Sequence, residues 1–267
     1  TGLDKDYAFS FSMEIAEPFV MMVPRIMGGS DLQELQPEES KAIEVLQTMP
    51  PQLQQQLSFS WYWGGIGGTT GPPYVGAIIC FLAIMAMFVL DGKHKWWMGT
   101  ACVLAIMMSW GSYFEGFNTI FYEYLPFYNK FRAPSMILVI CQLLLPALAV
   151  LGVQAIIDTP DKKLLMPKFK KGLIATGVVF ALLLIIYNSF EYLQPAEKQM
   201  LQRVAQSGQQ QLVEVIRQFF DGVKEDRETL FKNDLLRSFG FILVAIAILF
   251  LLIRKTLSAK VAIIGLT

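Results

Sequence analysis

Five long apolar runs without a charged side chain constrain the fold of this chain more than any other feature. They cover Tyr74–Leu90, Trp96–Trp110, Pro134–Ile157, Gly172–Tyr187 and Ser238–Ile253. A helix of about 17 to 25 residues crosses the roughly 30 Å hydrocarbon core of a bilayer, and the second, fourth and fifth runs are shorter than this. Because 54% of the residues are hydrophobic and only 16% are charged, we predict an all-α polytopic integral membrane protein with about five transmembrane helices.

Basic residues between the runs indicate how the chain crosses the membrane. Lysines concentrate in the links 91–95 and 158–171, and three cations lie in the tail 254–267, where a further apolar run begins. Cytoplasmic loops are rich in Lys and Arg, so we predict these segments on the cytoplasmic side. Four transmembrane helices then lie within 74–187 and a fifth at 238–253. Residues 1–73, the loop 112–133 and the polar helical segment 188–237 are predicted outside, with an interfacial or re-entrant piece at Met13–Pro24.

The sequence lacks the residues needed for several kinds of catalytic and binding site. His94 is the only histidine, and the three cysteines lie inside apolar runs without metal-ligand spacing, so we predict neither a metal site nor a Ser-His or Cys-His nucleophile. Lys+Arg and Asp+Glu balance at 22 each, which does not indicate a nucleic-acid partner. The glycine cluster at 64–73 matches no phosphate-loop pattern and is predicted as a tight loop before the first run.

Two cations precede the third run in the stretch "FYNKFRAPSM". Pro134 suits the first turn of a helix, so Lys130 and Arg132 fall beside the positive end of that helix. This placement becomes favourable around an anion, most naturally a phosphate at head-group depth. Two alternatives remain open: the cations contact ordinary phospholipid head groups, or they pair with Glu115 and Glu123.

Motifs along most of the chain resemble a known family. The stretch "YWGGIGGTTGPPYVGAIICFLAIMAMF" is similar to the "fWg…tsGPvYvGa" region of the YfhO family of bacterial multi-spanning membrane proteins. "YLPFYNKFRAPSMILVICQLLLPALAVLGVQ" resembles its "lPgfnkFRaPsr" region, and "DRETLFKNDLLRSFGFILVAIAIL" resembles its "DR…l…DalRS…fil" region. "MEIAEPFVMMVPRIMGGSD" is close to its "E…l.Pn..GGs" passage. The order is the same, and the wording resembles the Bacteroidetes type.

This resemblance implies a GT-C-like glycosyltransferase of the bacterial inner membrane. Such enzymes transfer a sugar from a polyprenyl-phosphate carrier on the extracytoplasmic face, so the implied partners are membrane lipids and the polyprenyl-phosphate-linked sugar. The acidic catalytic residue is expected in a loop before Thr1, which makes this chain a segment of a longer protein, and Glu14, Glu17 and Asp31 are not assigned that role. The resemblance implies no cofactor in this segment and a divalent metal in the full-length enzyme.

The matching positions supply the expected site residues. Asn129, Lys130 and Arg132 are expected to bind the lipid phosphate, while Asp234 and Arg237, three residues apart on a helix, are expected to form a structural ion pair. Two other functions remain open. A flippase for lipid-linked substrates needs a polar route that the uncharged runs do not offer, and an assembly subunit would use segment 195–237 as a docking surface.

Overall fold

The computed structural model describes residues 2–30, 40–57, 59–67 and 73–266, and over these residues the chain is helical without a strand. The predicted all-α class is therefore confirmed. Part of the glycine cluster, residues 68–72, and Asp31 lie outside the described residues.

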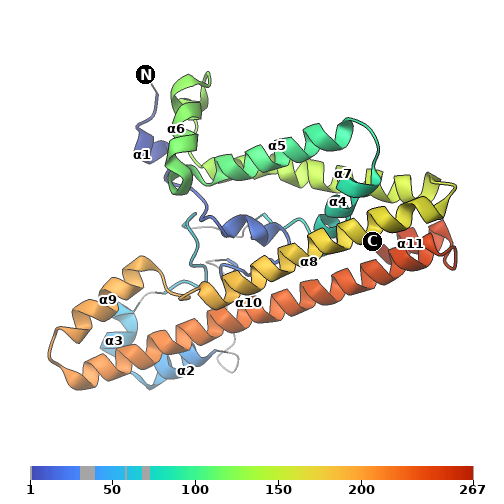
Figure 1. Ribbon diagram of the computed structural model, residues 1–267. Coiled ribbons are helices and arrows are strands. Elements are labelled where there is room, and N and C mark those ends of the chain that lie inside the picture. The colour runs from blue at the N-terminus through green and yellow to red at the C-terminus, as the bar shows by residue number, and fades with distance from the viewer. Residues whose placement is uncertain (1, 31–39, 58, 68–72, 267) are drawn as a thin grey trace.

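Most of the described helices form a long bundle or, at one end of it, a smaller cap (Figure 1). The bundle contains α4 (Ala77–Val89), α5 (His94–Ser109), α7 (Val139–Asp158), α8 (Leu165–Ser189), the second half of α10 (Gln210–Ile253) and α11 (Ala259–Leu266). The cap contains α2 (Lys41–Thr48), α3 (Pro51–Gln56), α9 (Pro195–Ala205) and the first half of α10. Near the same end lie α1 (Lys5–Ala8) and α6 (Glu115–Tyr124). Short 3-10 helices complete the chain: η1 (Glu17–Met21), η3 (Gly111–Phe114), η4 (Tyr128–Lys130), η5 (Pro134–Leu138) and η6 (Lys162–Leu164).

Three helical stretches of the described chain are long and apolar enough to cross a membrane. They are Pro134–Asp158, Lys162–Ser189 and Gln210–Ile253. The other two apolar runs form shorter helices, because α4 has 13 residues and α5 has 16. At 1.5 Å per residue these helices are about 20 and 24 Å long, less than the roughly 30 Å of a hydrocarbon core. The predicted number of five spans is therefore not confirmed.

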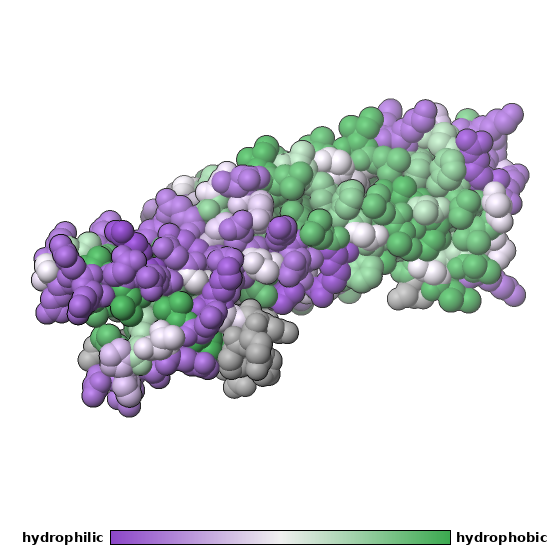
Figure 2. All heavy atoms as spheres, turned by 90° about the horizontal axis from the view of Figure 1, so that it is seen from below, coloured by the Kyte–Doolittle hydropathy of each residue, from purple (hydrophilic) through white to green (hydrophobic). Residues whose placement is uncertain are grey.

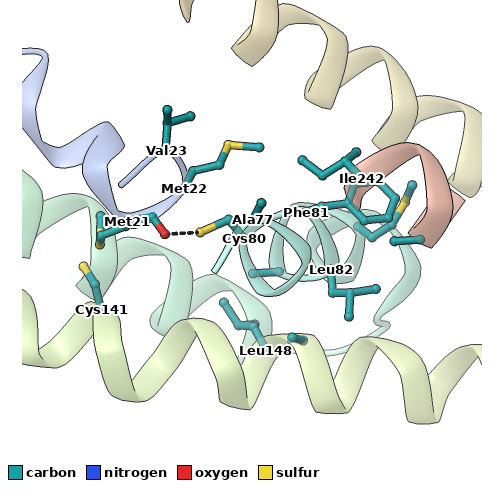
Figure 3. Packing of buried hydrophobic residues seen from close by; sticks show 14 of the residues in the cluster. Met21, Met22, Val23, Ala77, Cys80, Phe81, Leu82, Cys141, Leu148 and Ile242 are labelled. Atoms are coloured by element: carbon teal, nitrogen blue, oxygen red, sulfur yellow. Dashed lines mark hydrogen bonds between the residues drawn. The ribbon is translucent and has the colours of Figure 1, made fainter. Parts of the chain in front are cut away.

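The central position of α4 explains why it is apolar on every side. It packs against α7, α8 and α10, and a helix that is surrounded needs no polar face. An added Cβ at Gly152 of α7 would lie 2.7 Å from the Cβ of Ala86, so this glycine permits a close approach of α7 and α4. Figure 3 shows Phe81 and Leu82 of α4 within this core, near Leu148 and Ile242.

The segment Met13–Pro24 also packs into this core. Met13, Val20 and Val23 are fully buried, and the Cys80 thiol of α4 donates a hydrogen bond to the Met21 carbonyl at 3.4 Å (Figure 3). Most apolar side chains of this segment thus contact protein, while Ile15 is half exposed. All three cysteines are buried and unpaired, as predicted for small hydrophobic residues.

The face of the bundle seen in Figure 2 is mostly apolar between two polar ends. Leu143, Val150 and Ile174 are each about two-thirds exposed on the long apolar helices α7 and α8, at 71%, 68% and 68%. The links from α4 to α5, from α7 to α8 and from α10 to α11 lie together at the end far from the cap (Figure 1). We call this the link end. It gathers the three basic segments from which the topology was predicted.

The cap has a small hydrophobic core of its own. Phe219, Phe220 and Val223 on α10 pack with Ala42 of α2 and with Leu193 before α9. The polar segment 195–237 is helical as expected, but it is not separate from the last apolar run. Residues 210–253 form one continuous helix of 44 residues, which joins the cap to the bundle.

Candidate functional site

The loop between α6 and α7 lies at the cap end of the apolar stretch Pro134–Asp158 and presents large apolar side chains to solvent. Tyr124, Phe127, Phe131 and Met136 are each more than 70% exposed. Two left-handed residues, Phe127 (φ 65°) and Ala133 (φ 69°), bend the backbone on either side of η4. We call residues 124–136 the aromatic loop. Exposed rings in this number are typical of an interaction surface.

Arg132 has an ordered place within the aromatic loop. Its Nη1 donates to the Tyr7 hydroxyl at 2.8 Å, and its guanidinium lies over the rings of Tyr7 and Phe11, at 5.3 and 5.0 Å from their centroids. Stacking on two rings restrains an otherwise flexible side chain. Because a guanidinium has five N–H donors, it retains donors for an anion beyond the one used by Tyr7.

The other two predicted phosphate ligands lie on the same loop. Lys130 is the last residue of η4 and is exposed. The carbonyl of Asn129 accepts from the Leu3 amide at 2.7 Å, which ties the N-terminal segment to the loop. The structure thus brings Asn129, Lys130 and Arg132 together within four residues of backbone, beside exposed rings.

The start of the helix contributes less to an anion site than the sequence suggests. The stretch from Pro134 begins as the 3-10 helix η5, and its Ser135 amide points to the Phe11 carbonyl at 3.4 Å. The Met136 amide donates to the Ala133 carbonyl at 3.1 Å. An anion here would therefore be held mainly by side chains.

Glu115 has a partner other than the two loop cations. Its carboxylate accepts from Lys5 Nζ at 2.6 Å. The hydrogen bond to Lys5 lowers the pKa of Glu115 and raises the pKa of Lys5. Lys5 is thus the ion-pair partner of Glu115, a carboxylate that the sequence suggested as a partner for Lys130 or Arg132.

Buried ionic groups on α10 fasten distant segments to that helix. Asp234 accepts from Arg25 Nε at 2.8 Å and Nη2 at 2.7 Å, and Arg237 Nη2 lies 3.1 Å from Asp234 Oδ1. Asp234 is 1% exposed, whereas Arg237 is half exposed. Arg25 is therefore the closer and more buried partner, and no local sequence pattern indicates it because 209 residues separate the two.

A second buried pair lies two turns earlier on α10. Arg227 is fully buried and donates to both carboxylate oxygens of Glu197, at 2.7 and 2.8 Å. It also donates to the carbonyls of Ser60 and Tyr192. One guanidinium thus joins α10, α9 and two loops.

Asp226 caps another helix from outside it. Its carboxylate accepts from the Ser40 hydroxyl at 2.8 Å and from the amides of Lys41 and Ala42 at 3.0 Å each. A carboxylate beside the first amides of a helix is favoured by the dipole of that helix. Asp226, Arg227 and Asp234 therefore have structural roles.

A buried carboxylate joins η1 to the loop at 62–66. Glu17 is fully buried and accepts from the Tyr62 hydroxyl and from the amides of Gly65 and Glu14, at 3.0 and 2.9 Å. Burial raises the pKa of Glu17, while these hydrogen bonds oppose the shift. Burial, and then the charge of Glu17, raises the pKa of Glu14.

Glu17 has a structural role, because its carboxylate oxygens already accept hydrogen bonds from the protein and the side chain is not exposed to solvent. Across the described residues, no cluster of three or more His, Cys, Asp or Glu side chains is arranged to hold a metal ion. The aromatic loop is therefore the candidate site best placed to bind a ligand.

No protein-family model, curated protein or solved structure matches this chain.

Proposed function

We propose that this chain is a segment of a bacterial inner-membrane glycosyltransferase of GT-C type. In this proposal the enzyme transfers a sugar from a polyprenyl-phosphate carrier to an acceptor on the extracytoplasmic face. The sequence resemblance to the YfhO family supports the assignment, as do three helices of sufficient length and apolarity to span a membrane. The basic link end would face the cytoplasm.

One observation carries the proposed site. The stacked guanidinium of Arg132 and the ammonium of Lys130 lie among exposed rings, beside the cap end of a stretch that can span a bilayer. In a membrane this loop would lie at head-group depth, where aromatic side chains are favoured. A phosphate there is anionic, while the polyprenyl chain beside it is apolar. The loop provides cations for the phosphate and exposed aromatic rings for the polyprenyl chain.

The reaction assigns a role to each group. The bond between the anomeric carbon of the sugar and the carrier phosphate oxygen breaks, and a bond from that carbon to the acceptor oxygen forms. Arg132 and Lys130 stabilise the negative charge that develops on the departing phosphate. An acidic residue outside the present sequence accepts the proton of the acceptor hydroxyl.

Binding of a polyprenyl phosphate to the full-length protein in nanodiscs tests the site. We expect Lys130→Ala/Arg132→Ala to weaken binding by about 100-fold or more, because a hydrogen bond to a charged group contributes about 1.5 to 3 kcal/mol. Lys41→Ala/Arg217→Ala is the matched control, since it removes two exposed cations from the cap. Equal binding by the loop variant and this control would refute the phosphate site.

The same preparation separates the transferase from the flippase. Sugar transfer that falls with Arg132→Ala, in a protein of unchanged thermal stability, supports the enzyme. Carrier binding with no transfer to any extracytoplasmic acceptor, together with movement of the carrier across a vesicle bilayer, would replace it with the transport function.

A further inference from the structure

A polar cavity lies where α8 ends and the chain turns into α9. Its volume is about 530 Å³. Seven side chains that can form hydrogen bonds line it: Tyr187, Asn188, Glu191, Tyr192, Lys198, Lys224 and Glu228. These residues come from α8, the connection 190–194, α9 and α10. The cavity belongs neither to the aromatic loop nor to the buried ion pairs.

The charges in this cavity cancel. Two carboxylates and two ammonium groups line it, and Glu191 pairs with Lys198. Glu228 accepts from the Tyr187 hydroxyl at 2.5 Å. Carboxylates would repel a phosphate or another anion, and ammonium groups would repel a cation. The lining therefore favours a neutral ligand with many hydrogen-bonding groups.

The backbone at the cavity is held in a conformation that a non-glycine residue rarely adopts. Tyr192 has a φ of 55°. Its hydroxyl donates to the Tyr187 carbonyl at 2.7 Å, and its own carbonyl accepts from the buried Arg227 at 2.9 Å. Strained residues that their surroundings fix in place are typical of binding sites. Tyr187, Phe190 and Tyr192 also place aromatic rings along the cavity.

We infer that this cavity binds a neutral carbohydrate. Sugar hydroxyls donate and accept, and the cavity provides carboxylate acceptors, ammonium donors and an amide that does both. The C–H faces of a sugar ring pack against aromatic side chains, which bind apolar surface. The cavity opens at the cap end of α8, just beyond its apolar part. The inference concerns a site separate from Lys130 and Arg132 and does not depend on the lipid-phosphate role of that loop.

Binding of neutral sugars to the full-length protein tests this inference. The protein is studied in nanodiscs, because maltoside detergents themselves carry a sugar. The probes are methyl α-glucoside, methyl α-mannoside, methyl α-galactoside and N-acetylglucosamine, and saturation-transfer NMR with titration gives the affinity. We expect at least one probe to bind, and Glu228→Gln to weaken that binding at least tenfold.

Glu225→Gln is the matched control, because Glu225 lies one turn away on α10 and pairs with Lys41 outside the cavity. Tyr187→Phe is the second variant: it keeps the ring and removes only the hydroxyl, so it also should weaken binding. Sugar binding that survives Lys130→Ala/Arg132→Ala supports an independent site. The inference is overturned if no probe binds, if Glu228→Gln binds like Glu225→Gln, or if inorganic phosphate displaces the sugar from the cavity.

Discussion

Glu197→Gln should destabilise the protein by removing the charge that balances Arg227. The pair is almost completely buried, with side-chain exposures of 0% for Arg227 and 8% for Glu197. Breaking such a pair on one side typically costs about 3 to 5 kcal/mol, because the remaining charge is buried without compensation. Two carbonyls continue to accept from Arg227, so we expect a loss near the lower limit, about 3 kcal/mol.

Thermal unfolding of the full-length protein in nanodiscs checks this magnitude. A domain of 150 to 250 residues loses about 2 to 4 °C in Tm for each kcal/mol, so the expected decrease is about 6 to 12 °C. All variants must be heated at one scan rate, since Tm depends on the scan rate when unfolding is irreversible. Glu225→Gln breaks an exposed pair with Lys41, and should change Tm by less than about 2 °C.

A Glu197→Gln variant that unfolds at the same temperature as Glu225→Gln would refute this reasoning. It would mean that the two carbonyls satisfy the guanidinium without the carboxylate. Glu197→Leu/Arg227→Met supplies the complementary result. Replacing both partners with apolar side chains should recover most of the lost stability, because a buried pair contributes little beyond its own desolvation cost.

Three further predictions concern packing, capping and pH. Gly152→Ala should cost about 1 to 3 kcal/mol, seen as a lower Tm, because the new methyl group would meet Ala86 at 2.7 Å and α7 would have to move from α4. An unchanged Tm would show that the two helices separate freely. Asp226→Ala should weaken α2 by about 0.5 to 2 kcal/mol, and hydrogen exchange of the amides 41–48 should accelerate about 2- to 30-fold; unchanged protection would rule out the capping role. Burial raises the pKa of Glu17 in the folded state, so the folded protein binds the proton more tightly and loses stability as pH rises from the ordinary pKa of glutamate through the raised value. Glu17→Gln should flatten this part of the pH–stability profile, and a profile identical to that of the wild type would contradict the assignment.

Local patterns predict the long apolar helices, because the hydropathy of each run indicates that its own residues lie away from water. The run Pro134–Ile157 corresponds to η5 and α7, and Gly172–Tyr187 lies within α8. α8 begins earlier, at Leu165, because lysines are good helix formers and continue the helix into the basic link. The sequence of α4 does not show whether this helix spans a membrane, since an apolar helix inside a protein has the same composition as a helix in lipid.

The buried polar contacts have no local signal. Arg25 and Asp234 lie 209 residues apart, and Glu17 and Tyr62 lie 45 apart. Each residue alone looks like an ordinary charged or aromatic side chain, and only the folded chain brings the partners together. Arg237 is the partner that spacing indicates for Asp234, and it is the more exposed of the two arginines. The cations of the aromatic loop stand out in the sequence, but the rings of Tyr7 and Phe11 that hold Arg132 do not.

Because α10 is continuous, a tilt of its bundle half moves the cap as well. Its 44 residues extend for about 66 Å, and nearly half of that length belongs to the apolar bundle. Asp226, Arg227 and Asp234 attach α2, α9 and the Arg25 segment to this one rod. A pivot of only 5° about the far end would swing the cap tip by about 6 Å, because displacement grows with the length of a rigid helix. Bilayer thickness, which influences the tilt of a membrane-spanning helix, would thereby change the position of the cap relative to the membrane surface.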